Sequence, residues 1–239
     1  MYQLYYWPGI QGRGEYVRLA LEEAAAPYQD LALVPEARGG GAKAIASVID
    51  DASIARPPFA PPFLRAGRQW IGQTPNILLY LGERLRLAPA DAAGRLWAHQ
   101  LQLTIADFLV EIHDTHHPIG SGLYYEDQKA ATRRRARDFT AHRLPKFLGY
   151  FERVLERSGG RWAAGRRFSY VDLSLAQVVA GLRYAFPRAT RRGLRRCPLL
   201  VVLHDRVVER PRIAAYLASP RRVPFNDDDI FRHYPELDG

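Results

Sequence analysis

Cysteine is almost absent from this sequence. Cys197 is the single cysteine among 239 residues. One thiol cannot form an internal disulfide, a Cys-X-X-Cys redox pair or a thiolate zinc site. The sequence therefore excludes a small secreted domain held together by disulfides. A proline follows Cys197, and we expect this cysteine to be a buried packing residue.

Long apolar runs are also absent. No uncharged apolar run reaches the roughly 18 residues that a membrane-spanning helix requires. The N-terminal residues show no basic segment followed by an apolar one, so the sequence predicts no signal peptide. We therefore expect a cytoplasmic protein that has no membrane partner.

Lysine is scarce, although the chain is basic. Its 34 lysines and arginines exceed its 25 acidic residues by a formal charge of +9, and only Lys43, Lys129 and Lys146 are lysines. The excess lies in residues 133–196, which hold 17 basic and four acidic side chains. A basic segment can bind nucleic acid when exposed aromatics are interleaved with its arginines. We instead favour an arginine-rich solvated face that attracts an anionic ligand, without a nucleic-acid partner.

The first 80 residues alternate between strand and helix signals. A β-prone run, Tyr2 to Tyr6, precedes a helical apolar stripe over residues 17–24, and Leu31 to Val34 is a second strand candidate. This β-α-β order indicates parallel strands. A short helix is predicted near Ala42–Ile49, and the residues from Phe63 to Ile71 predict a hairpin.

The rest of the chain shows helical spacing and no convincing strand. A helix is expected at Thr74 as the N-cap, with Pro75 in its first turn. The fold class is therefore α/β followed by all-α. We divide the chain into an α/β unit at residues 1–83, a linker at 84–94 and an all-α unit at 95–239.

A capping box stands before the most apolar helical segment. Ser169 supplies the hydroxyl of the N-cap, and Asp172 lies three residues later, as the motif requires. This pair is expected to support folding and not catalysis. Further helices are expected around residues 200–208 and 212–217.

Four motifs follow one another along the chain: Tyr6-Trp7-Pro8 with Gly12-Arg13-Gly14-Glu15, Pro62-Phe63-Leu64 running to Gln73-Thr74, Ser169-Tyr-Val-Asp172, and Pro198-Leu199 running to Arg210-Pro211. In this order and spacing they make the sequence similar to the cytosolic glutathione transferases, most of all to the tyrosine-type, sigma-like branch. The resemblance implies an N-terminal thioredoxin-like domain, a C-terminal helical bundle and a homodimer. It also implies a detoxifying enzyme with glutathione as co-substrate.

By this resemblance Tyr6 is the catalytic residue, with Tyr5 as a competing register. A free thiol has a pKa of roughly 8.5, and only the thiolate is a good nucleophile. A phenol that donates its O–H to the sulfur stabilises the thiolate. The thiolate then attacks a small, hydrophobic electrophile. A module that binds glutathione or dimerises without catalysis is the alternative.

The resemblance places the remaining glutathione contacts. Gln73 and Thr74 begin a helix whose free N–H groups hold the γ-glutamyl carboxylate. Pro62 corresponds to the cis-proline of the family, although Pro61 before it has no N–H, so that either proline could be the cis residue. Arg13 is expected to bind the glycine carboxylate.

Three further assignments complete the predicted site. Lys43 is the candidate contact from the loop after the second strand, and Asp107 is the candidate acid that reaches the partner subunit's glutathione. The second substrate is expected in a cleft lined by these four side chains: Trp7, His113, His117 and Tyr124. The histidines of the segment 113–117 invite a metal site, but no distal ligand set is evident. We therefore predict no metal.

Overall fold

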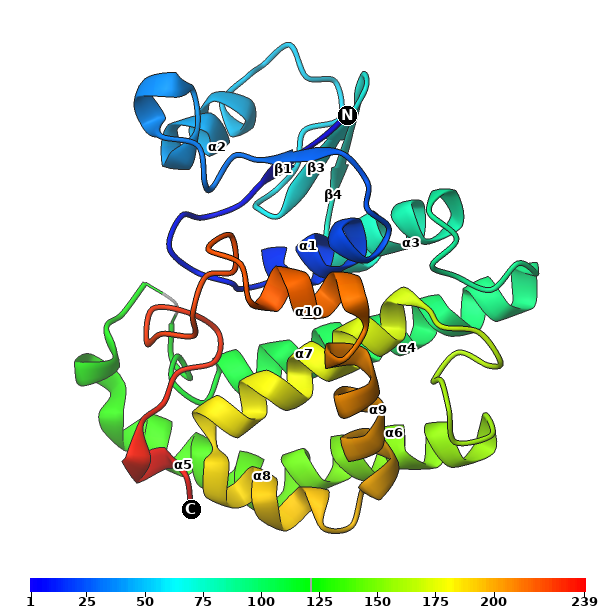
Figure 1. The fold of residues 1–239 in the computed structure, drawn as a ribbon. Helices are drawn as coiled ribbons and strands as arrows, with labels where there is room; N and C mark the ends of the chain where they lie inside the picture. Colours follow the sequence, from blue (N-terminus) through cyan, green and yellow to red (C-terminus); the bar gives the residue numbers. More distant parts are fainter. Residues whose placement is uncertain (121) are drawn as a thin grey trace.

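The structure is a computed structural model that describes residues 1–120 and 122–239. Figure 1 shows a small sheet with its helices on one side of the molecule and a group of long helices on the other. Among the described residues, none of the helices combines the length and the apolar character needed to cross a bilayer.

A mixed four-stranded sheet forms the core of the N-terminal part, in the order β2-β1-β3-β4. Strands β1 and β2 are parallel, as the β-α-β pattern predicts, and β3 and β4 form the predicted hairpin. β1 pairs antiparallel with β3. The strands are β1 Tyr2–Tyr5, β2 Tyr28–Asp30, β3 Phe63–Ala66 and β4 Gln69–Gly72.

The prediction for the second strand was wrong in position. The strand β2 ends at Asp30, directly before the run of Leu31 to Val34 that was predicted to form it. The Asp30 side chain accepts a hydrogen bond from the Ala32 N–H at 3.0 Å, and the Asp30 carbonyl accepts one from Leu33. Aspartate favours such local turns, which end a strand even where apolar residues follow.

Helices cover both faces of the sheet. α1 (Gly14–Glu23) and α3 (Thr74–Arg84) pack on one face, where Leu4 lies, and α2 (Gly41–Ile49) packs on the other. Neighbouring residues of a strand point to opposite faces, so Tyr5 lies on the α2 side. A single turn of 3₁₀-helix, Glu36–Arg38, precedes α2.

The start of α3 differs from the prediction by one residue. The helix already includes Thr74, and Gln73 takes the capping position with φ +67°. A left-handed backbone is uncommon for a residue other than glycine and is found where the surroundings enforce it. Neither residue caps the helix with its side chain. The Thr74 hydroxyl donates instead to the carbonyl of Arg13 at 3.3 Å.

Within the described residues the chain after β4 contains helices and no strand, as predicted. The long central helix, α7, is buried along nearly its whole length. Short 3₁₀ and π turns occur at Tyr125–Gln128, Phe139–Arg143 and Pro235–Leu237. The helices are α4 Ala92–His113, α5 Lys129–Asp138, α6 Leu144–Arg157, α7 Tyr170–Ala185, α8 Pro187–Leu194, α9 Pro198–Val208 and α10 Pro211–Leu217.

Helices α5 and α8 were not predicted from the sequence. Each buries only two or three side chains, such as Thr132 and Ala136 in α5, so neither shows a broad apolar stripe. Their remaining positions are mainly arginines, and Arg133, Arg191 and Arg192 are exposed. This agrees with the predicted arginine-rich solvated face.

The capping box at the start of α7 is confirmed. Asp172 has no exposed surface and accepts hydrogen bonds from the backbone N–H groups of Ser169 and Ala163, each at 2.7 Å. Burial raises the pKa of the Asp172 carboxyl to about 6, against these hydrogen bonds, which lower it. Cys197 is buried, as predicted for a packing residue.

Candidate active site

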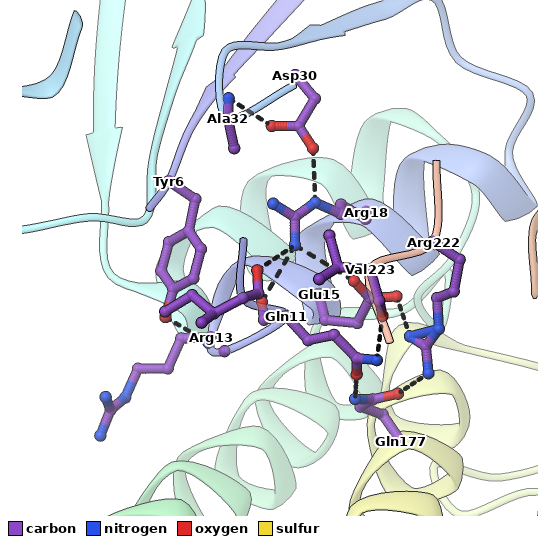
Figure 2. A network of polar contacts seen from close by, with 12 residues as sticks. Tyr6, Gln11, Arg13, Glu15, Arg18, Asp30, Ala32, Gln177, Arg222 and Val223 are labelled. Carbon is purple, nitrogen blue, oxygen red and sulfur yellow. Dashed lines mark hydrogen bonds and ion pairs between the residues drawn. The ribbon is translucent and has the colours of Figure 1, made fainter. Parts of the chain in front are cut away.

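Tyr6 lies directly after the end of β1 and is almost completely buried, with 4% of its surface exposed. Its phenol oxygen accepts a hydrogen bond from the backbone N–H of Arg13 at 2.8 Å (Figure 2). The N–H uses a lone pair of the oxygen and leaves the phenol proton free. Tyr6 can therefore still donate a hydrogen bond to a ligand.

Two glycines make room for the Tyr6 ring. A Cβ atom on Gly12 would lie 2.0 Å from the phenol oxygen, and one on Gly14 would lie 2.6 Å from the ring. Gly12 also has φ +44°, a conformation that side chains disfavour. The glycines on either side of Arg13 thus allow the backbone of this loop to approach the phenol.

The backbone of Arg13 joins two parts of the candidate site. Its N–H contacts the phenol of Tyr6, and its carbonyl accepts the hydroxyl of Thr74 at the start of α3. The first N–H groups of a helix lack partners within the helix and carry partial positive charge. The phenol and the start of α3 therefore lie on either side of one residue.

Burial sets the protonation state of Tyr6. Burial and, to a lesser extent, the nearby Asp229 carboxylate raise the pKa of the phenol to about 12, although the Arg13 N–H acts to lower it. At neutral pH the phenol is therefore protonated. It is equipped to donate a hydrogen bond and not to act as a base.

Tyr5 points to the opposite face of the sheet. Its ring stacks on Phe63, with the ring centres 4.9 Å apart, and meets the edge of Trp70 at 5.4 Å. These contacts explain the burial of Tyr5 as packing of aromatic rings between the sheet and α2.

The peptide bond between Pro61 and Pro62 is cis. Of the two alternatives that the sequence left open, the structure has Pro62 as the cis residue. The last pair of the β1–β3 ladder is Tyr5 with Phe63, so Pro62 and Tyr6 lie just beyond it on neighbouring strand ends.

The other predicted glutathione contacts are more exposed. The Arg13 side chain points away from the buried Arg18 (Figure 2). The Lys43 side chain is 80% exposed and pairs with Glu36 at 3.5 Å. Asp107 lies on the exposed side of α4. The structure joins Tyr6, Arg13 and Thr74 by hydrogen bonds. Among the residues that it describes, no hydrogen bond or ion pair links Lys43 or Asp107 to these three.

The residues predicted for the second-substrate cleft differ in their surroundings. Trp7 and Tyr124 are exposed, at 43% and 79% of their surface. His113 and His117 follow one another around the end of α4, and their rings stack with centres 4.8 Å apart. No hydrogen bond links these four residues to Tyr6 among the described contacts.

Sequence reasoning overlooked His116, which is the buried member of this cluster. Its Nε2 lies 2.9 Å from the Ile230 carbonyl, and its Nδ1 lies 2.6 Å from Nδ1 of His117. A carbonyl only accepts, so Nε2 carries the proton of neutral His116, and His117 donates to Nδ1. Burial lowers the pKa of His117 to about 4 and that of His116 to about 2, which keeps both rings neutral at pH 7.

Metal binding finds no support at these histidines. Over residues 1–120 and 122–239, no three His, Cys, Asp or Glu side chains lie close enough together to hold a metal ion. The histidine rings are occupied by one another and by a backbone carbonyl.

A buried charge network that the sequence did not predict lies beside the Tyr6 loop (Figure 2). Glu15 and Arg18 of α1 are almost fully buried and pair at 3.3 Å, and Arg18 also reaches Asp30 at 2.6 Å. Arg222, from the segment after α10, pairs with Glu15 from the other side. No local pattern marks this last contact, since the two residues are 207 positions apart.

Comparison with known proteins matches residues 113–220 to the family model of the glutathione S-transferase C-terminal domain. The protein named glutathione S-transferase P 1 of Xenopus laevis is 26% identical over 226 residues, which cover 92% of this chain and 93% of that protein. A Pi-class glutathione S-transferase of Onchocerca volvulus has a TM-score of 0.69 at 22% identity, covering 90% of this chain and 91% of that one.

A prostaglandin synthase D of Nilaparvata lugens has a TM-score of 0.70 at 20% identity, covering 94% of this chain and all of that one. These likenesses confirm the predicted fold class of a small mixed sheet with helices and a C-terminal helical domain. The family model and the related sequences make this chain similar to the glutathione S-transferases, and the solved structures share its fold.

Proposed function

We propose that this protein is a glutathione transferase in which Tyr6 activates the thiol of glutathione. The contacts of Arg13 carry the proposal, because they bring the protonated phenol of Tyr6 beside the start of α3. A carboxylate at that helix end and a thiol at the phenol would be two ends of one ligand. The phenol donates to the sulfur and favours the thiolate.

The thiolate attacks a small electrophile held next to it, and the electrophile's leaving group departs as the carbon–sulfur bond forms. Holding the two reactants together turns the bimolecular step into an effectively unimolecular one. We assign Gln73, Thr74 and Pro62 to glutathione, and we assign His113, His117 and Trp7 to the side of the electrophile. The motif Gly12-Arg13-Gly14-Glu15 supports the tyrosine-type, sigma-like branch.

We also propose that the enzyme is cytoplasmic, acts in detoxification and consists of a glutathione-binding unit at residues 1–83 and a helical unit at 95–239. The predicted linker at 84–94 is shorter in the structure, because α4 already begins at Ala92. Glutathione is the co-substrate and no metal takes part. The exposed arginines of the helical unit attract anions without forming a nucleic-acid site.

The homodimer finds support in an exposed apolar stripe on α4. Leu96, Leu103 and Val110 are spaced seven residues apart and are 71%, 47% and 47% exposed, so that they share one side of the helix. Phe59, in the loop before β3, is 90% exposed. Apolar side chains gathered in this way on a surface mark contact sites. Asp107 lies on the same helix and would face the partner subunit.

The dimer predicts a change of mass for one variant. Leu103→Glu places a charge in the proposed contact, where desolvation costs several kcal/mol, so we expect monomers at micromolar concentration. Sedimentation equilibrium measures the mass. Val202→Glu on α9 is the matched control, because Val202 is 46% exposed and lies outside the stripe. A Leu103→Glu protein with the mass of a dimer would contradict this interface.

Turnover tests the function itself. We expect retention on glutathione resin, elution by free glutathione and conjugation of glutathione to a chlorodinitrobenzene-type electrophile. Binding without turnover on any of several electrophiles would favour the non-catalytic module. Failure of both, together with strongly salt-dependent binding to DNA, would favour a nucleic-acid partner of the arginine-rich face.

A further inference from the structure

The loop that carries Arg13 takes its support from the opposite end of the chain. Residues 7–9 of this loop are exposed. The backbone N–H of Gly12 donates to both carboxylate oxygens of Asp229, at 2.9 and 3.0 Å, and that of Gln11 donates to the same carboxylate at 3.1 Å. Asp229 is only 3% exposed. Asn226 adds a contact to the Gly9 carbonyl at 2.8 Å.

The side chain of Gln11 strengthens the same junction (Figure 2). It donates to the Val223 carbonyl, and its own oxygen accepts a hydrogen bond from Gln177 of α7 at 2.8 Å. The segment 222–229, which we call the C-terminal strap, therefore holds residues 9–12 from outside the N-terminal unit. In Figure 1 the strap follows α10 and runs beside the dark blue loop between β1 and α1.

Three successive backbone N–H groups are shared between two acceptors. Those of Gln11 and Gly12 go to Asp229, and that of Arg13 goes to the phenol of Tyr6. The peptide plane of the Arg13 N–H is joined to that of the Gly12 N–H at the Cα of Gly12, so an acceptor that holds the first two planes leaves only the two dihedral angles of Gly12 to direct the third.

We propose that Asp229 is a positioning residue, which holds the loop at Gln11 and Gly12 so that the Arg13 N–H stays on the phenol of Tyr6. The effect on catalysis rests on the proposed function, whereas the effect on the loop does not. Asp229 contacts no substrate and acts only through the backbone of residues 11–13.

The electrostatic effect of Asp229 opposes its positional effect and allows a test. Its negative charge raises the pKa of Tyr6, and a negative charge near the sulfur disfavours a thiolate. Removing only the charge should therefore help the reaction, whereas removing the two acceptor oxygens should harm it. Asp229→Asn mainly removes the charge, since its amide oxygen can still accept the Gly12 N–H. Asp229→Ala removes both the charge and the acceptor oxygens.

The experiment compares amide hydrogen exchange and kinetics of the full-length variants. For Asp229→Ala we expect exchange at residues 9–13 to rise about tenfold or more, since these amides open more often. We expect kcat to fall about tenfold, with the KM for glutathione within about threefold of wild type because α3 is intact. Asp229→Asn should return kcat to within about threefold of wild type.

Asp238→Ala is the matched control. Asp238 is also buried in the C-terminal segment and also accepts two successive backbone N–H groups, those of Arg188 and Ala189, at 2.7 and 2.9 Å. We expect it to lower the melting temperature without changing exchange at residues 9–13 or kcat. An Asp229→Ala protein with wild-type exchange at residues 9–13, or with a kcat no lower than that of Asp229→Asn, would overturn the proposal. A wild-type protein without turnover would overturn only the proposed function and the kinetic part, because exchange needs no electrophile.

Discussion

Tyr6→Phe is expected to lower kcat/KM for glutathione conjugation by about 10- to 100-fold at neutral pH. The substitution removes one hydrogen bond to a charged sulfur, which contributes about 1.5–3 kcal/mol, and each 1.4 kcal/mol corresponds to about tenfold in rate. The deficit should shrink as the pH approaches the thiol's unperturbed pKa of roughly 8.5, because the thiolate then forms without help. Initial rates against pH, with saturating electrophile, measure both effects.

Tyr5→Phe is the control for this experiment. Tyr5 is as deeply buried as Tyr6, at 7% against 4% exposed, but it packs on Phe63 on the opposite face of the sheet. We expect its loss of a hydroxyl to leave the rate unchanged. If Tyr5→Phe slowed the reaction and Tyr6→Phe did not, the assignment of the catalytic tyrosine would be wrong.

Asp172→Ala is expected to lower the free energy of unfolding by about 3–5 kcal/mol without altering kcat in the protein that folds. The substitution leaves the N–H groups of Ser169 and Ala163 buried without an acceptor, at about 1–3 kcal/mol each, and it also removes the cap of α7. For a chain of this size the melting temperature should fall by roughly 10 °C. Thermal unfolding and the yield of folded protein measure the loss.

Asp91→Ala is the control that separates the free-energy cost of losing a helix cap from the cost of leaving buried N–H groups without an acceptor. Asp91 caps α4 by accepting the Gly94 N–H at 2.7 Å, but it is exposed. Water can replace the lost acceptor there, so we expect a cost of about 1 kcal/mol.

A soluble Asp172→Ala protein with normal stability and no activity would show that Asp172 serves the chemistry and not the fold.

The chain's local features were predictable because local physics sets them. A capping box needs only the residues from Ser169 to Asp172, and the β3–β4 hairpin needs only its turn and its apolar flanks. Local sequence signals also misplaced one strand and missed one helix. The turn at Asp30 ended β2 before Leu31, and the polar surface of α5 hid a helix that packs through Thr132 and Ala136.

The sequence by itself determined the β-α-β order and the hairpin of the N-terminal part, the helical character of the rest, the capped central helix and the place of Tyr6 beside the end of the first strand. Tertiary structure decided what surrounds that tyrosine. Asp229 accepts a hydrogen bond from Gln11 although the two residues are 218 positions apart, and no local sequence pattern near either residue predicts this contact. A periodic pattern records which side of an element is buried, but it does not record which distant segment covers it. The partners of the Tyr6 loop therefore became visible only in the folded chain.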